Sequence, residues 1–181
     1  GDSNVFVGTN TGQSNTIGSK NTFIGINSGQ RNYRGNANVF MGTGAGSSNS
    51  QGSSNVFCGI DAGQNNQDGN ENVFIGKSTG KASQYGSKNV FIGDSCGNQN
   101  YKGSKNVFIG NFAGSNSQQS DNNIFIGYNS GAYNSSSIIT ILSAIATING
   151  IDYDLQEYLQ SLVTNEGLLN FTYEHDIEIS F

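Results

Sequence analysis

One short segment near the C-terminus gathers the residue types that metal sites and hydrolytic centres use. His175, the only histidine, stands between Glu174 and Asp176. From Leu169 to Phe181 apolar and polar residues alternate as in a half-buried β-strand, so sequence neighbours point to opposite faces. We therefore expect a packed or interfacial histidine and a solvated carboxylate face rather than a metal site. No Ser-His-Asp arrangement can be assigned.

The two cysteines, Cys58 and Cys96, fit neither a zinc site nor a disulfide. Structural zinc takes four Cys or His ligands, and one histidine with two distant cysteines cannot supply them. The cysteines fall two coils apart in the repeat described below, and two steps of about 4.8 Å exceed the roughly 7 Å limit for bridged Cα atoms. We expect two buried free thiols. We find no catalytic residue, so we expect neither an enzyme nor a bound metal or cofactor.

Aromatic and cationic residues gather at two adjacent variable positions of the repeat, and these residues are the candidate ligand-binding ridge. They are Tyr33, Arg34, Tyr85, Tyr101 and Lys102. Tyr85 and Lys102 occupy the same position in adjacent coils, so we expect them to lie side by side. Such a ridge could contact a glycan or a protein receptor. The alternative is ordinary variation of surface loops.

A strict 17-residue period organises the first three quarters of the chain. It returns one aromatic residue eight times without a slip: Phe6, Phe23, Phe40, Phe57, Phe74, Phe91, Phe108 and Phe125. Each copy begins with an asparagine: Asn4, Asn21, Asn38, Asn55, Asn72, Asn89, Asn106 and Asn123. A fixed period of this size is typical of a solenoid, whose coils cannot bury their apolar faces alone. We therefore predict an all-β, parallel β-solenoid of eight coils.

Each position of the repeat has a structural meaning. We number the positions from the asparagine, so that Asn4 is position 1 and Lys20 is position 17. Positions 2 to 4, as in Val5-Phe6-Val7, form a strand signal, and the glycine at position 5 ends the strand. A small residue and a second glycine at positions 8 and 9 indicate a tight interior corner. The stacked asparagines are expected to hydrogen bond along the axis as a ladder.

Composition and the length of apolar runs argue against nucleic acid as a partner and against a membrane span. Only 34% of residues are hydrophobic and 12% are charged, which would suggest disorder if the period were not so regular. Lysine and arginine total eight, form no cluster and leave a net charge of −5, so nucleic acid is not an expected partner. No apolar run reaches the roughly 18 residues of a membrane span, so this fragment is not expected to cross one.

The strand has apolar side chains on both faces, which predicts self-association. Position 3 carries phenylalanine, whereas positions 2 and 4 carry Val, Ile and similar residues on the opposite face. A thin coil has one interior, so one of the two stacks must face outward. A long apolar stripe in water usually marks an interface. We therefore expect a homo-oligomer in which one stack fills the coil and the other fills the subunit interface.

The repeat resembles the heads of trimeric autotransporter adhesins and repeats of phage tail fibres and bacterial surface fibres. The resemblance covers about residues 4–136 and is carried by segments such as Asn106-Val107-Phe108-Ile109-Gly110-Asn111-Phe112-Ala113-Gly114. It implies a homotrimer that is extracellular, on a cell surface or on a virion fibre, and that serves in adhesion. The 17-residue repeat and the phenylalanine, where adhesin heads often carry alanine, depart from that family's pattern.

A different pattern begins after the solenoid. Apolar residues at 3-4 spacing predict a coiled-coil-like seam: Ile138, Ile141, Ile145, Ile148, Leu155, Leu159 and Leu162. Isoleucine at both seam positions in the first half favours a trimer or a higher state over a dimer. Asn149-Gly150 breaks the pattern, so a β-ribbon followed by a separate helix from Asp154 is the alternative. We predict a solenoid head over 1–136, a helical neck over 137–166 and a C-terminal strand or trimer cap over 167–181.

Together these features predict a non-enzymatic trimeric fibre fragment that projects from a surface and attaches to a glycan or protein receptor. A purely structural spacer of a surface or tail fibre is the first alternative. A depolymerising tailspike enzyme is the second, and it needs paired acids in a groove. The solenoid offers few acids to pair, because beyond the first turn it has only five: Asp61, Asp68, Glu71, Asp94 and Asp121.

Overall fold

The computed structural model describes residues 1–133, 145–148 and 151–154. The chain divides into two compact units, Gly1–Ile141 and Leu142–Phe181, which are described separately below. No helix occurs among the described residues.

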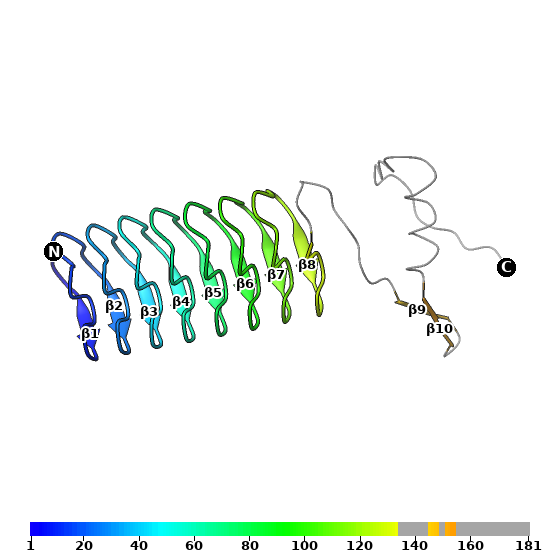
Figure 1. The fold of residues 1–181 in the computed structure, drawn as a ribbon, viewed down its shortest axis with the longest axis horizontal. Helices are drawn as coiled ribbons and strands as arrows, with labels where there is room; N and C mark the ends of the chain where they lie inside the picture. The colour runs from blue at the N-terminus through cyan, green and yellow to red at the C-terminus, as the bar shows by residue number, and fades with distance from the viewer. Residues whose placement is uncertain (134–144, 149–150, 155–181) are drawn as a thin grey trace. The chain divides into compact units, whose positions relative to one another are not determined.

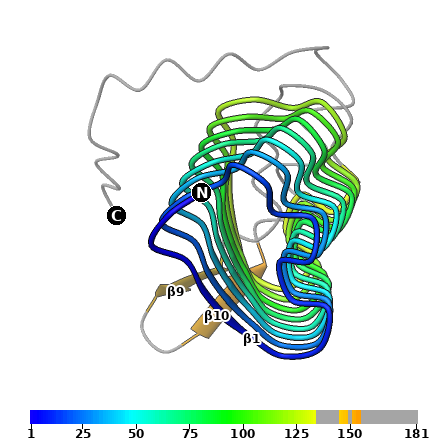
Figure 2. The same cartoon turned by 90° about the vertical axis from the view of Figure 1, so that its left-hand side faces the viewer.

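The first unit is a parallel β-solenoid with one short strand in each coil (Figure 1). The strands are β1 (Val5–Val7), β2 (Thr22–Ile24), β3 (Val39–Met41), β4 (Val56–Cys58), β5 (Val73–Ile75), β6 (Val90–Ile92), β7 (Val107–Ile109) and β8 (Ile124–Ile126). They form one sheet in chain order, with each residue paired to the residue 17 positions later, as in Phe6↔Phe23. Figure 2 looks along the stack, where successive coils nearly superimpose. The predicted parallel β-solenoid with a 17-residue coil is confirmed.

Glycine ends each strand because the next coil leaves no room for a side chain. Gly25 has a φ of 131°, and a Cβ on it would lie 2.6 Å from the carbonyl oxygen of Gly42 in the following coil. Both the backbone conformation and the close stacking therefore require glycine here. The same constraint recurs at every strand end from Gly8 to Gly110.

The phenylalanine column fills the interior of the coil. Neighbouring rings have centroids 4.7–5.0 Å apart and planes within 3–20° of parallel. Rings from Phe23 to Phe125 are buried, while Phe6 in the first coil is partly exposed. Each ring covers the second glycine of its coil: a Cβ on Gly29 would lie 2.5 Å from the Phe23 ring. The phenylalanines are thus core residues, enclosed by the chain's own coils rather than placed at a subunit surface.

Two asparagine ladders line the same interior. At position 1, the Asn38 side-chain amide donates to the Gly52 carbonyl at 2.8 Å, and its Oδ1 accepts from the backbone N–H of Asn55 at 2.9 Å. At position 12, the first four asparagines form a second ladder, in which each side-chain amide donates to the side-chain oxygen of the preceding one, as from Asn49 to Asn32 at 2.6 Å. These bonds satisfy buried polar groups that would otherwise destabilise so thin a core.

The second unit contains an antiparallel strand pair. Strand β9 (Ile145–Ile148) pairs with β10 (Ile151–Asp154), and Ile148 lies opposite Ile151. Over these residues the chain is therefore extended, as in the β-ribbon alternative, and a helix does not run unbroken through the seam. The rest of the predicted neck (137–166), the predicted cap (167–181) and His175 with its acidic neighbours lie outside the described residues.

Candidate interaction surfaces

The outer face of the eight-stranded sheet is a continuous apolar band. It consists of positions 2 and 4 of each coil, because the phenylalanine at position 3 points inward. Thr22 is the only residue at these positions that is not Val, Ile, Met or Cys. Within the stack Met41 is 46% and Ile75 is 40% exposed, whereas the band residues of β6 and β7 are half-buried. No charged residue interrupts the band. We call these sixteen positions the outer face.

Cys58 lies on this outer face, which corrects the expectation that both thiols are buried. It occupies repeat position 4, the last residue of β4, and is half-buried. Cys96 occupies repeat position 8, the small residue of the interior corner, and is buried. The Cys96 thiol donates to the Phe108 carbonyl at 3.2 Å, and burial raises its pKa to about 12. Both cysteines are free thiols.

The predicted ligand-binding ridge is divided into two clusters. In the second coil, the Arg34 guanidinium lies 5.4 Å from the centroid of the Tyr33 ring. Three coils further along, Tyr85 meets Tyr101 edge to face, with centroids 5.5 Å apart, and the Lys102 ammonium lies 5.7 Å from the Tyr101 ring. Tyr101 thus contacts both Tyr85 and Lys102, the pair expected to stack on each other.

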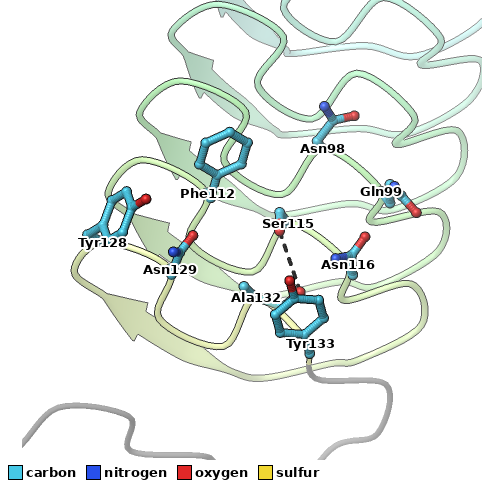
Figure 3. A pocket seen from close by; sticks show the side chains of 9 residues that line it. All are labelled: Asn98, Gln99, Phe112, Ser115, Asn116, Tyr128, Asn129, Ala132 and Tyr133. Atoms are coloured by element: carbon cyan, nitrogen blue, oxygen red, sulfur yellow. Dashed lines mark hydrogen bonds between the residues drawn. The ribbon is translucent and has the colours of Figure 1, made fainter.

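A pocket of about 390 Å³ lies on the last three coils, on residues that the sequence analysis did not single out. Its lining comprises Asn98, Gln99, Phe112, Ser115, Asn116, Tyr128, Asn129, Ala132 and Tyr133 (Figure 3). In Figure 3, Phe112, Tyr128 and Asn129 lie on one side of Ser115, the other three amide side chains lie on the opposite side, and Tyr133 lies below. The signal was available in the sequence, because these aromatic residues interrupt positions that are otherwise polar, small or aliphatic.

The described residues contain no group that resembles a metal or acid–base centre. No cluster of three or more His, Cys, Asp or Glu side chains occurs in that part of the chain. Its one ion pair joins Lys81 to Asp61 at 3.2 Å, and Gln64 also donates to the Asp61 carboxylate. Among the same residues, no helix is long and apolar enough to cross a membrane.

Comparison of the chain with family models, with curated proteins and with solved structures finds no match.

Proposed function

We propose that this chain is a segment of a homotrimeric extracellular fibre, on a cell surface or a virion, that projects from its carrier and attaches to a receptor. The outer face carries the proposal. It carries an apolar residue in every coil, and strand propensity alone would also be met by polar threonine, as at Thr22. Exposed stripes of this kind usually mark interfaces.

The size of the outer face supports association. Seven steps of about 4.8 Å make the band roughly 34 Å long, and a width of about 12 Å gives an area on the order of 400 Å². Burying it in three chains would contribute about 30 kcal/mol at roughly 25 cal/mol per Å². Two association steps oppose this with roughly 4–15 kcal/mol each. The balance favours a closed assembly when flanking residues such as Ile26 and Ile60 add to the contact.

A threefold arrangement suits this band better than isolated pairs. Three copies around one axis bring a single face of each chain against both neighbours, so one apolar band per chain is sufficient for a closed trimer. The resemblance to trimeric fibre heads points the same way. The isoleucine seam contributes less, because Ile145 and Ile148 lie in a strand and coiled-coil rules do not apply there. In this proposal a helical neck would begin only after β10.

The proposed attachment role competes with two alternatives. A structural spacer would use the same trimer but bind no ligand. A depolymerase would need a pair of carboxylates within reach of one bond, and the Asp61 carboxylate instead pairs with Lys81. The exposed aromatic clusters support attachment over the spacer, because no core or ladder position requires them.

The oligomeric state provides the test. We expect a mass of three times the 19.1 kDa chain in light scattering. Ile75→Asp with Ile92→Asp places charge on the outer face and should yield a folded monomer. Gln51→Asp with Gln119→Asp is the matched control, because it adds the same two negative charges at repeat position 14, which Asp68 already occupies. A parent chain that is a stable folded monomer would exclude the trimer.

A further inference from the structure

The aromatic residues of the pocket depart from the repeat at three different positions. Tyr128 stands at position 6, where earlier coils carry Thr, Ile, Lys, Asp or Asn. Tyr133 stands at position 11, and none of the preceding coils has an aromatic residue there. Phe112 stands at position 7, where all the other coils have Asn, Asp, Ser or Gly. These three aromatic residues belong to the last two coils, and all three line the same pocket.

Phe112 is an unfavourable residue for its backbone. Its φ is 57°, in the left-handed region, where Gly, Asn and Asp are tolerated but a bulky side chain is an outlier. It is the only aromatic residue among the non-glycine residues with positive φ in the described part of the chain. The residue is 42% exposed, so burial offsets only part of the strain. An exposed ring held at a strained position is a reason to look for a ligand.

The amide side chains of the pocket have hydrogen-bonding capacity to spare. In the first two coils, equivalent amides pair with each other, as Asn10 does with Asn27 at 3.2 Å and Gln30 with Gln13 at 3.1 Å. The side chains of Asn98, Gln99, Asn116 and Asn129 make no hydrogen bond to another described residue. Each amide offers two donor hydrogens and an acceptor oxygen. The lining contains no charged side chain.

We infer that this pocket binds a neutral oligosaccharide. A sugar ring presents a C–H face, which packs on an aromatic ring, and a rim of hydroxyl groups, which both donate and accept hydrogen bonds. Tyr128 and Tyr133, 74% and 88% exposed, supply flat apolar surfaces, and the amides match the hydroxyls. An anionic ligand would lack a cation here, and a metal ion would lack a carboxylate or imidazole. The volume lies within the range of small-ligand sites, about 300–1,000 Å³.

This inference rests on the proposed attachment role and names its receptor class, but the pocket lies within one chain. The experiment uses the full chain and a panel of neutral oligosaccharides of two to four hexose or N-acetylhexosamine units, with sialylated and sulfated counterparts. Saturation-transfer NMR identifies the sugars that bind, and calorimetry measures their affinity. Light scattering of the same sample reports the oligomeric state.

Each variant replaces an aromatic residue by one that the repeat itself uses. Phe112→Asn copies Asn129, and Tyr128→Thr copies Thr43. Both should weaken binding of the neutral sugar at least tenfold, while Phe112→Asn keeps or raises the melting temperature because it relieves the left-handed strain. Ser50→Gln, which copies Gln67, lies outside the pocket and the ridge and should leave the affinity unchanged. Tyr101→Gln, which copies Gln84, removes a ring from the ridge and tests the ridge as the competing site.

Three results would overturn the inference: no neutral sugar bound at millimolar concentration, a preference for acidic sugars, or unchanged binding by Phe112→Asn. Loss of binding only in Tyr101→Gln would also refute it by moving the site to the ridge. A monomer that still binds sugar through Phe112 would refute the trimer alone, and a trimer that binds none would refute the pocket alone.

Discussion

The inner asparagine ladder at position 12 contains a break, and repairing it should stabilise the solenoid. Asn15, Asn32, Asn49 and Asn66 are joined amide to amide at 2.6–2.7 Å. The next position is Ser83, whose side chain is too short to continue the ladder. Within the described residues, Asn66 Oδ1, Ser83 Oγ and both polar atoms of the Asn100 side chain have no hydrogen-bond partner.

Ser83→Asn should restore these contacts. The new amide would donate to Asn66 Oδ1 and to the Gly86 carbonyl, as Asn66 donates to Asn49 Oδ1 and the Gly69 carbonyl at 2.7 and 3.1 Å. Its oxygen would accept from Asn100. Each bond contributes about 1 kcal/mol net, and an unsatisfied buried group costs about 1–3 kcal/mol. After the loss of side-chain entropy we expect a gain of about 2 kcal/mol, equivalent to a melting temperature about 4–8 °C higher for a chain of this size.

Urea and thermal denaturation followed by circular dichroism provide the assay. Ser53→Asn is the matched control, because asparagine already occupies that surface position at Asn36 and Asn70, and we expect a change near zero. Asn49→Ser is the reciprocal change and should destabilise by a similar amount, since it removes the donor to Asn32. A Ser83→Asn protein no more stable than the Ser53→Asn control would refute the ladder argument.

Two further predictions concern the core and its buried thiol. Gly29→Ala should destabilise the solenoid by about 1–3 kcal/mol in urea denaturation, because its Cβ would meet the Phe23 ring and its φ is 55°; unchanged stability would mean that the ring does not fix this glycine. Because burial raises the pKa of Cys96 from its ordinary 9.0 to about 12, the folded state holds the thiol proton over a pH range in which the unfolded chain loses it. The resulting stability is present below pH 9 and is lost as pH rises toward 12. In urea denaturation between pH 9 and 12, stability should therefore fall more steeply with pH in the parent than in Cys96→Ala, which copies Ala113, and an equal fall in both would contradict the burial argument.

The period, the strands and the parallel register could be predicted from sequence, because a solenoid repeats the same local physics in every coil. The alternation Val-Phe-Ile also implied two apolar faces. It did not say which face points inward, since both are hydrophobic enough to form a core. The deciding residue is the second glycine, as at Gly29, which leaves space for one phenylalanine ring and no other side chain. The same ambiguity explains why Cys58 was expected to be buried.

The C-terminal segment resisted prediction for a different reason. Isoleucines at 3-4 spacing suit a helical seam, yet isoleucine is also a strong strand former. Asn149-Gly150 favours a tight hairpin turn, and the flanking residues pair as β9 and β10. In β9 and β10 the strand preference of isoleucine prevails over the short helical period.

In a solenoid of this kind, assembly and recognition depend on different parts of the sequence. The outer face is apolar because every coil repeats Val and Ile at positions 2 and 4, so an interface along the stack follows from the period itself. A specific ligand cannot be recognised by features that every coil shares, since each coil would then bind it equally. Recognition must therefore come from exceptions to the period. The strongest exception is Phe112, which adopts an unfavourable backbone conformation and lines the same pocket as Tyr128.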